Sequence, residues 1–520
     1  EDLYDGYKNG RDSMLAGLYS SAKSLLRSRS EHKPIVYRQY RRAGEQFDYR
    51  AYGKAGWVLH MLRTELGEKM FRKCVKTYLQ RHALGCVVTE DLRSVIEELT
   101  GRSFDRFFDQ WVYHGRHPDL KVSYNWSQKD RLAKISVEQT HKVDDNVMLF
   151  HFGTKIRFII DDKVVDREIA VNSGQHDFYF ALPKAPRIVR FDPDYGLLAD
   201  IRFEKPAAML YAQLENADDI IGRLRAIDAL KKKKDKKTIA ALKSTLNNDP
   251  SDRVRRNASS ALRQIHTDDA FEALADSMKQ QDARVRQQVV GDVGGFYRPE
   301  SLKLTKRVLR QEKNPEILTR AIYNLGRYHD RASRKLMLQY MGTKSYRNSI
   351  ASAAIEVIRK LDDSFFIEPL KKALSENERE FTSGGFARAL DTLAHISRNK
   401  ENKTKIRTFL TDYVNHPKRT IQSGAIRALG TLGDPRAIAV VETFSGDDPA
   451  DRTQRSARDA LKALREKKPL VPDEVIRLRE TVDKLSKETD KLRDDLADMK
   501  NRLDAKEQAA KDKSGDETSD

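Results

Sequence analysis

Residues 52–63 read Tyr-Gly-Lys-Ala-Gly-Trp-Val-Leu-His-Met-Leu-Arg and open an apolar helical pattern that decides the fold of the first part of the chain. Apolar residues recur at three- and four-residue spacings, at Leu59, Leu62, Leu66 and Met70, and again at Leu92, Val95, Ile96 and Leu99. This period places them on one face of a helix, which we expect to be buried. Gly101 marks the end of the second helix. The pattern predicts that residues 1–120 are helical.

Further landmarks follow in order: Leu66-Gly67-Glu68, Thr89-x-Asp91-Leu92, Gly101 and Phe107-Phe108-x-Gln110-Trp111. Together with the Tyr52 stretch, this series resembles the distal half of the catalytic domain of the aminopeptidase N-like zinc metallopeptidases, the gluzincin aminopeptidases. The resemblance covers residues 1–120. It implies the distal helical part of a thermolysin-like catalytic domain, a peptide substrate, and zinc ligands that precede this stretch.

The resemblance also implies a catalytic role for Tyr52. Peptide hydrolysis at zinc passes through a tetrahedral oxyanion, and a donor opposite the metal stabilises that charge as it develops. In the family the donor is the tyrosine of a Tyr-x-Lys-Gly-Ala sequence, and Tyr52 stands at that position. Here Ala55-Gly56 reverses the Gly-Ala order. Tyr49 is the second candidate, and a tyrosine before an apolar helix is also common in a buried core.

A gluzincin metal site needs the sequence His-Glu-x-x-His, which puts two imidazoles on one helix face. None of the 12 histidines stands in that arrangement. The segment 1–4, Glu-Asp-Leu-Tyr, resembles the helix that follows the family's third ligand, so we expect the zinc ligands of the intact parent upstream of residue 1. We expect this chain alone to bind no metal and to be inactive. His114 and His117 are spaced to chelate but have no neighbouring third ligand, and we expect His60 to pack inside its helix.

Composition limits the other possibilities. A chain of 520 residues predicts several domains, and no run approaches the roughly 18 apolar residues of a membrane helix. Its 97 Lys and Arg residues are interleaved with 78 Asp and Glu residues over the whole length, a pattern typical of solvated helix faces, so nucleic acid is not favoured as a partner. The dense run Lys231–Lys237 is a candidate for an acidic partner. Cys74 and Cys86 are too few for a disulfide framework, and the compartment stays undetermined.

Residues 121–205 change to a period of two. Short alternating runs occur at 135–139, 156–160, 178–182 and 188–191, separated by Asp, Asn, Gly and Pro. Strands at this spacing predict a small antiparallel β-sandwich. The resembled family places a β-sandwich directly after its catalytic domain, and Phe191-Asp192-Pro193 looks like one of its turns.

Residues 206–466 repeat. A small residue recurs 31 to 36 positions apart, at Ala226, Ala258, Val289, Ala321, Ala354, Ala389, Ala425 and Ala457. An aliphatic residue follows each one four positions later, at Leu230, Leu262, Val293, Leu325, Ile358, Leu393, Leu429 and Leu461. A small residue lets neighbouring helices approach, and the aliphatic one packs into the next layer. The pattern resembles short HEAT repeats and predicts an α-solenoid of about eight units, so the chain as a whole is predicted to be multidomain and mainly α.

Apolar residues then alternate three and four apart at Val475, Leu478, Val482, Leu485, Leu492, Leu496, Met499 and Leu503, with Thr489 at the remaining seam position. This heptad seam predicts a coiled coil over residues 472–508. A single helix folded back on the repeats is the alternative. Residues 509–520 have the composition of a disordered tail.

Two interpretations of function follow. The first is the C-terminal portion of a zinc metallo-aminopeptidase, which removes N-terminal residues from peptides, with a coiled coil for self-association and repeats open to a protein partner. The alternative is a non-catalytic HEAT-repeat scaffold that binds proteins and carries a degenerate peptidase domain. A third possibility, nucleic-acid binding by the basic repeats, predicts an affinity that collapses with salt.

Overall fold

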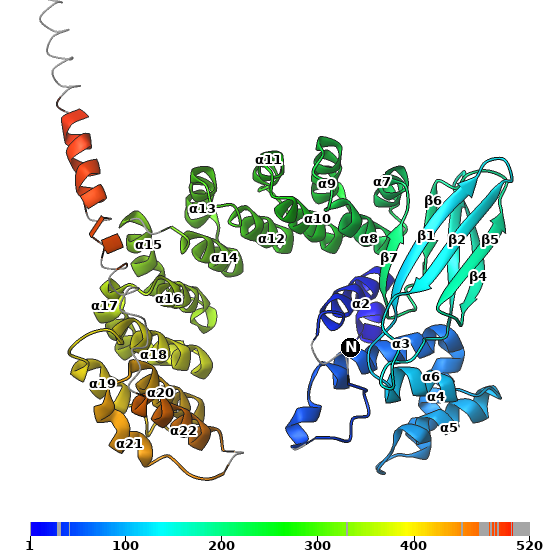
Figure 1. The fold of residues 1–520 in the computed structure, drawn as a ribbon. Coiled ribbons are helices and arrows are strands. Elements are labelled where there is room, and N and C mark those ends of the chain that lie inside the picture. The colour runs from blue at the N-terminus through cyan, green and yellow to red at the C-terminus, as the bar shows by residue number, and fades with distance from the viewer. Residues whose placement is uncertain are drawn as a thin grey trace, which may run out of the picture. The chain divides into compact units, whose positions relative to one another are not determined.

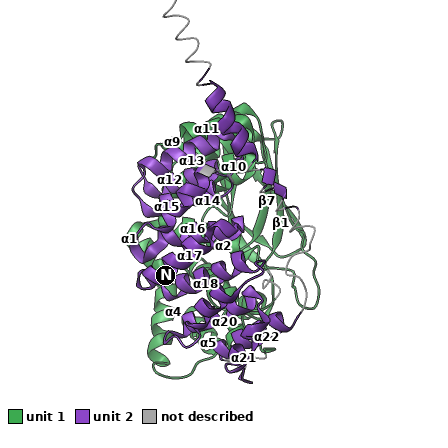
Figure 2. Cartoon of the chain, turned by 90° about the vertical axis from the view of Figure 1, so that its left-hand side faces the viewer, with its two compact units in different colours: residues 1–280 green, residues 281–520 purple. Residues whose placement is uncertain are grey.

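The computed structural model describes residues 2–28, 33–40, 42–328, 331–448 and 451–466, followed by 478, 481–482, 484–485, 488–500 and 502. The chain divides into two compact units, residues 1–280 and 281–520 (Figure 2). The boundary falls inside the predicted repeat array. In the described residues, no helix has both the length and the apolar character needed to cross a bilayer.

The first unit begins with helices and short turns, as the period of its apolar residues predicts (Figure 1). The α-helices are α1 (Asp2–Asn9), α2 (Arg11–Leu25), α3 (Ala55–Leu66), α4 (Glu68–Arg81), α5 (Thr89–Thr100) and α6 (Asp105–Phe108). A 3-10 turn, η2 (Ala43–Gln46), and two π-helical turns, η3 (Arg50–Lys54) and η4 (Asp109–Tyr113), complete the segment. Gly101 ends α5 in the left-handed conformation, with φ 67°, which glycine adopts without a Cβ penalty.

The buried face of α3 agrees with the prediction at Leu62 and differs from it at Leu59. Leu59 is 43% exposed, whereas Trp57 and Met61 are buried. The Trp57 ring packs edge-on against Tyr195 at 5.1 Å between centroids, so a partner distant in the sequence decides which side of α3 faces inward. Cys74 on α4 is buried, as is usual for a free cysteine that packs as a small apolar side chain.

Residues 119–204 form two sheets. The strands are β1 (Asp119–Ser127), β2 (Leu132–Gln139), β3 (Phe152–Ile160), β4 (Lys163–Val171), β5 (Gln175–Ala181), β6 (Ile188–Phe191) and β7 (Asp200–Glu204). One sheet has the order β5-β2-β1-β7 and the other β4-β3-β6. Phe158 of β3 and Phe180 of β5 meet across the layers, with ring centroids 5.3 Å apart. Apolar residues at alternate positions therefore fill the space between the sheets.

The prediction of a purely antiparallel arrangement is wrong for the last strand. β7 pairs in parallel with β1, with Leu120 opposite Ile201. The chain leaves β6 in the three-stranded sheet, crosses to the other sheet, and enters the free edge of β1 in the same direction as β1. Parallel neighbours need such a crossover connection, and a tight hairpin cannot supply one.

Helix pairs follow the sheets. The first helices of the pairs are α7 (Ala207–Glu215), α9 (Lys236–Asn248), α11 (Asp268–Asp276), α13 (Pro299–Gln311), α15 (Arg331–Met341), α17 (Ile367–Asn377), α19 (Thr404–Thr411) and α21 (Ile438–Glu442). The second helices are α8 (Ile220–Leu230), α10 (Asp252–Ile265), α12 (Ala283–Val293), α14 (Pro315–Leu325), α16 (Ser349–Leu361), α18 (Ser383–Ser397), α20 (Arg419–Leu432) and α22 (Arg452–Arg465). Each small residue of the predicted register lies in one of these second helices and is at most 1% exposed.

The register has a direct packing cause within the second unit. There α12, α14, α16, α18, α20 and α22 contact one another in succession. Gly424 on α20 shows how close they come, because a Cβ at that position would lie 2.5 Å from the Cβ of Ala387 on α18. Small residues therefore occupy the helix-to-helix contacts, as stacked repeats require.

In the first unit, α2 is joined to α8. The Tyr19 hydroxyl donates to the carbonyl of Leu224 at 3.3 Å, and Lys23 pairs with Asp228 at 2.8 Å. The burial of Asp228 alone would raise its pKa. The charge and hydrogen bond of Lys23, together with hydrogen bonds from Lys231 and Tyr19, outweigh that effect and hold the pKa below its usual value. These contacts fix the helices that precede the sheets against the first repeat.

The predicted coiled coil and tail lie largely outside the described residues. Of the seam, Leu478, Val482, Leu485, Leu492, Leu496 and Met499 are described, and each is more than half exposed. The described stretch 488–500 is helical. A single helix with an exposed apolar seam has the surface that pairs with another helix in a coiled coil.

Candidate active site

Tyr52 projects from the π-helical turn η3 that leads into α3. Its side chain is 70% exposed, and the Phe47 ring lies 6.5 Å away between centroids. The hydroxyl makes no hydrogen bond with any residue that the structure describes. Single π-turns inside helices are rare and frequently occur at functional sites. Tyr52 therefore presents an open O–H donor from a distinctive piece of backbone.

Arg50 holds the start of this turn. It is 2% exposed, and its Nε lies 2.7 Å from a carboxylate oxygen of Asp48. One guanidinium nitrogen donates to the carbonyl of Pro34 at 2.9 Å, and the group also lies over the Tyr37 ring at 5.2 Å. A buried charge is tolerated only when it is paired and hydrogen-bonded. These contacts tie the backbone two residues before Tyr52 to the preceding segment.

Lys54 holds the other end of the turn. Its side chain is 3% exposed, and its Nζ donates to the carbonyl of His114 at 3.2 Å. The turn is therefore anchored by buried cations on both sides of the exposed Tyr52. The Lys54 ammonium group binds backbone within the structure and presents no group to solvent.

The two glycines of the motif, Gly53 and Gly56, differ in the space around them. A Cβ at Gly56 would meet no atom within 4 Å, so that place does not require glycine. At Gly53 a Cβ would lie 2.7 Å from two ring atoms of Tyr49. Tyr49 thus packs flat on Gly53, while Tyr52 is the more open of the two candidate tyrosines.

The histidines singled out in the sequence have separate partners. His60 packs against Trp57 and its Nε2 lies 2.9 Å from the carbonyl of Tyr195; burial lowers its pKa. His114 Nδ1 lies 3.0 Å from the carbonyl of Asp109, and His117 is buried with Asp119 at 3.7 Å. His60 therefore packs inside the fold, as expected.

A zinc site does not fit the residues of this chain as far as the structure describes them. Within the described ranges, no group of three or more His, Cys, Asp or Glu side chains is arranged to hold a metal ion. Zinc sites in proteins use three or four such ligands. We therefore derive no catalytic step through zinc from these residues.

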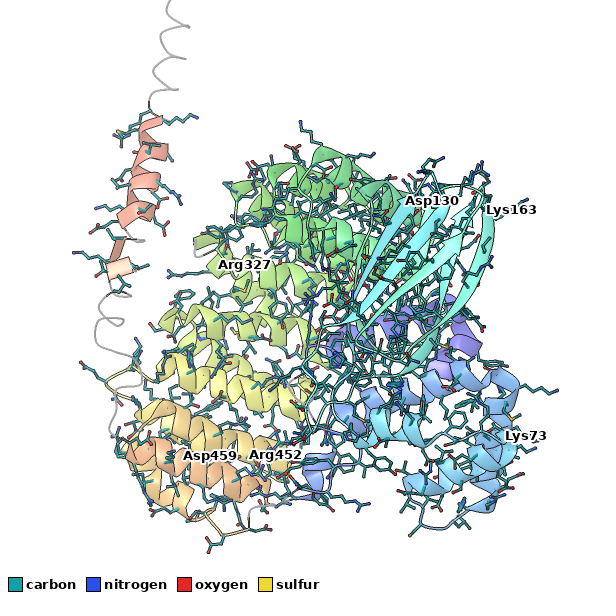
Figure 3. All side chains as sticks on the ribbon, turned by 45° about the vertical axis from the view of Figure 1, so that its right-hand side comes forward. Lys73, Asp130, Lys163, Arg327, Arg452 and Asp459 are labelled. Atoms are coloured by element: carbon teal, nitrogen blue, oxygen red, sulfur yellow. The ribbon has the colours of Figure 1, made fainter. Side chains whose placement is uncertain are left out.

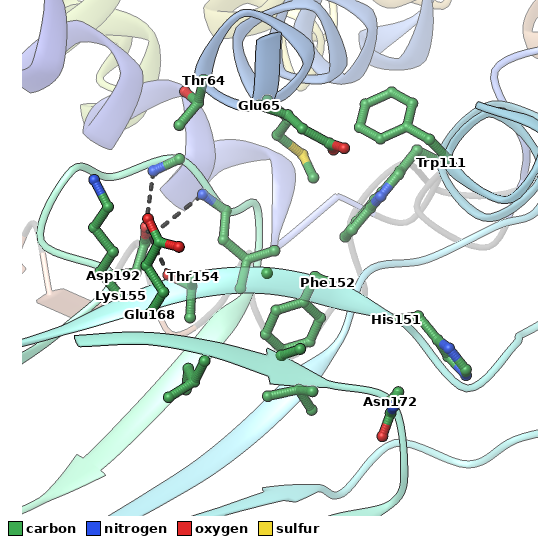
Figure 4. Close-up of a pocket in the computed structure, with 18 of the residues that line it drawn as sticks. Thr64, Glu65, Trp111, His151, Phe152, Thr154, Lys155, Glu168, Asn172 and Asp192 are labelled. Carbon is green, nitrogen blue, oxygen red and sulfur yellow. Dashed lines mark hydrogen bonds between the residues drawn. The ribbon is translucent and has the colours of Figure 1, made fainter. Parts of the chain in front are cut away.

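The first unit also contains a cavity of about 830 Å³ between helices and the sheet that contains β3 and β4 (Figure 4). Glu65 and Trp111 lie on its helical side, and Phe152 and Lys155 lie on its sheet side. Tyr52 is not among its lining residues. The cavity therefore lies apart from the candidate tyrosine.

Asp192 also lines this cavity. It is 2% exposed and accepts hydrogen bonds from the backbone N–H groups of Gly196 at 2.9 Å and Leu197 at 3.3 Å. Burial raises its pKa, although the Arg225 charge acts in the opposite direction. The Phe191-Asp192-Pro193 landmark is thus a turn whose carboxylate satisfies its own backbone.

Comparison with known proteins relates this geometry to a family. Residues 6–111 match the Peptidase family M1 domain, and residues 207–291 and 385–462 match HEAT repeats. Residues 6–111 are therefore similar to the M1 peptidases. The resemblance to aminopeptidase N-like metallopeptidases and the presence of HEAT repeats are both confirmed, as is the mainly helical fold with β-sheets.

Individual relatives agree with this assignment. Tricorn protease-interacting factor F2 of Thermoplasma volcanium is 25% identical over 142 residues, 26% of this chain and 18% of that protein. Puromycin-sensitive aminopeptidase of Caenorhabditis elegans is 31% identical over 101 residues, 19% of this chain and 10% of that protein. Aminopeptidase N of Lactococcus lactis subsp. lactis is 33% identical over 67 residues, 13% of this chain and 8% of that protein. The matches therefore span less than a fifth of each relative.

Among solved structures, Legionella pneumophila aminopeptidase A in complex with aspartic acid aligns with 87% of this chain and 61% of its own, at 12% identity and a TM-score of 0.42.

Arg50 is the residue of this site that the sequence did not reveal. Its contacts with Pro34 and Tyr37 reach back more than ten positions, which no helical or strand period records. The only local signal is Asp48, two residues before it, which could have indicated an ion pair.

Proposed function

We propose that this chain is the C-terminal portion of a zinc-dependent metallo-aminopeptidase that hydrolyses N-terminal residues from peptides. The relation to M1 peptidases over residues 6–111 supports the reaction class. In this proposal the zinc ligands come from outside these 520 residues, upstream of residue 1, because no His-Glu-x-x-His sequence occurs among them. The chain alone is accordingly proposed to be inactive and free of bound metal.

Tyr52 supplies the oxyanion donor in this proposal. When water adds to the scissile carbonyl, negative charge develops on its oxygen, and the phenol O–H donates a hydrogen bond to it without giving up its proton. The observation that carries the assignment is the open hydroxyl of Tyr52 on a turn held by the buried Arg50 and Lys54. Because buried contacts hold the turn, the backbone that carries this donor need not move when the charge appears.

A second function rests on the repeats. HEAT matches at 207–291 and 385–462 support a non-catalytic scaffold with a degenerate peptidase domain that binds a protein partner. In either function, the seam of exposed apolar residues that includes Leu492 and Leu496 would mediate self-association as a coiled coil.

Zinc analysis and peptidase assays on the native protein separate these functions. The protein isolated in its native form would be analysed for zinc by mass spectrometry and assayed with aminoacyl-coumarin substrates, beside the 520-residue chain. If the proposal is correct, the native protein binds zinc and releases the N-terminal residue, whereas the 520-residue chain does neither. A native protein with neither zinc nor activity would leave the scaffold as the function, and zinc-dependent activity in the 520-residue chain would contradict the placement of the ligands.

A further inference from the structure

The excess of positive charge is concentrated in one part of the chain. Residues 284–347 contain 15 Lys and Arg residues but 5 Asp and Glu residues, a surplus of ten within a chain whose net charge is +19. The stretch lies entirely in the second unit and includes α13, α14 and α15 (Figure 2). The mixing of charges that holds for the whole chain therefore does not hold here.

The basic side chains of α13 gather on its outer face. Ser301, Thr305 and Leu309 are buried. Lys303, Arg307 and Arg310 are exposed, and at 3.6 residues per turn they fall within an arc of roughly 60° opposite the buried face. None of the three makes an ion pair with a described residue. The face is thus a row of cations whose charge no carboxylate in the described chain neutralises.

The neighbouring helix α15 also carries an exposed cation. Its Tyr340 hydroxyl donates to the carbonyl of Leu309 on α13 at 3.0 Å, so the two helices are in contact. Lys335 is exposed on α15, away from the buried Met337. At the turn after α14, Arg327 is exposed as well (Figure 3).

An aromatic pair stands where α13 begins. Tyr297 lies two residues before Pro299, and its ring stacks on Tyr328 with centroids 5.0 Å apart and an interplanar angle of 17°. The Tyr328 hydroxyl donates to the carbonyl of Arg298 at 3.0 Å, which fixes the inner ring. Tyr297 is 74% exposed. The pair therefore offers an aromatic surface to solvent beside the row of cations.

We propose that α13 and the Tyr297–Tyr328 pair form a binding site for single-stranded nucleic acid. The cations of α13 contact backbone phosphates, and a base stacks on Tyr297, which is the combination that sequence-tolerant single-strand sites use. The charge density fits such a partner, because interfaces with nucleic acid are far more positive than interfaces between proteins.

Other polyanions fit this surface less well. In the described part of 284–347, the large hydrophobic side chains that are exposed are Tyr297 and Tyr346. Protein interfaces are depleted in lysine and have a more apolar core, and helices that lie on membranes need a broad apolar face. An acidic polypeptide and an anionic membrane are therefore the competing outcomes of the test.

The test measures fluorescence anisotropy of a labelled oligothymidylate of about 16 nucleotides, a length matched to single-strand sites, with the full 520-residue chain. The triple variant Lys303→Gln, Arg307→Gln and Arg310→Gln should weaken binding at least tenfold in about 0.1 M salt and reduce the salt slope by about 2, since each lost phosphate contact removes about 0.7. Tyr297→Ala should weaken binding by roughly tenfold or more through lost stacking.

A matched control removes the same charge elsewhere. Lys232→Gln, Lys233→Gln and Lys234→Gln change the exposed lysine run of the first unit. These changes should leave the affinity within about twofold, because none of the proposed phosphate contacts comes from that run. Tyr179→Ala changes an exposed tyrosine on β5 in the same unit and should have no effect.

Four results would overturn the proposal. Equal weakening by both triple variants would mean attraction by net charge alone. Binding of poly-L-glutamate or of phosphatidylserine vesicles as tightly as the oligonucleotide, with no effect of Tyr297→Ala, would indicate an acidic polypeptide or a membrane. Tighter binding of duplex than of single strand would contradict base stacking on Tyr297. Absence of any binding in about 50 mM salt would exclude the site altogether.

Discussion

Gly424 offers a quantitative test of how the repeats stack. In α20, a Cβ at this position would lie 2.5 Å from the Cβ and 3.0 Å from the Cα of Ala387 on α18, whereas ordinary contacts begin at 3.4 Å. The neighbouring atoms are backbone or attached directly to it, so α18 and α20 would have to separate. Overpacking of this kind costs about 1–3 kcal/mol, against a helix-propensity gain of about 1 kcal/mol for alanine over glycine. We expect Gly424→Ala to destabilise α18 and α20 by up to about 2 kcal/mol.

Gly291 on α12 is the matched control. The nearest atom to a Cβ there is the Cδ of Arg320 at 3.8 Å, so Gly291→Ala should stabilise its helix by about 0.5–1 kcal/mol. The chain's three tryptophans all lie in the first unit, and their fluorescence does not report on α20. Hydrogen exchange followed by mass spectrometry does, since about 1.4 kcal/mol of lost stability speeds exchange tenfold. Exchange in α18 and α20 that is no faster in Gly424→Ala than in the parent chain would refute the packing argument.

Other predictions concern charge and assembly. Asp219→Ala removes the carboxylate 2.5 Å from Arg190, which is 1% exposed, and should destabilise the first unit by about 3–5 kcal/mol; an unchanged unfolding midpoint by tryptophan fluorescence would contradict this. Hydrogen bonding from Arg284 is the main cause that lowers the pKa of Asp282 from 3.8 to about 2. The ionised Asp282 side chain caps α12, so it stabilises this helix above pH 3.8, and the stabilisation is lost as the pH falls through about 2. Hydrogen exchange in α12 should therefore become faster over this pH range, and Asp282→Asn should remove that change. Persistence of that dependence would count against the cap. Leu496→Asp should convert a self-associated chain into a monomer by light scattering, and an unchanged mass would argue against a coiled coil.

The sequence predicted the local and periodic parts of this fold. The strand runs at 156–160 and 188–191 lie within β3 and β6, and the repeat register falls on the second helix of every pair. These predictions are correct because the side chains that must be buried recur with a period of two in strands and of about 3.6 in helices.

Features that depend on distant partners could not be read in the same way. Arg190 and Asp219 are 29 positions apart and meet only after β6 and α8 are placed. The parallel pairing of β7 depends on which sheet edge is free, and the exposed Leu59 depends on where Trp57 finds Tyr195. Charge clustering at 284–347 was available in the sequence but disappears when charges are averaged over the whole chain.

Tyr52 itself is predicted from motif order, and its π-turn is not. The turn requires Gly53 beneath the Tyr49 ring and the buried Arg50 anchored to Pro34. The spacing of apolar residues predicts neither contact, because both depend on the conformation of one short segment.

The most direct test of the central claim is the turnover of Tyr52→Phe in a polypeptide that carries both the zinc ligands and residues 1–520. With an aminoacyl-coumarin substrate, loss of one oxyanion donor should lower kcat by about a hundred- to a thousandfold, while zinc content and hydrogen-exchange protection of α3 stay at the level of the parent. Tyr49→Phe is the control and should change kcat little, because that ring packs on Gly53. Unimpaired turnover in Tyr52→Phe would contradict the assignment of Tyr52.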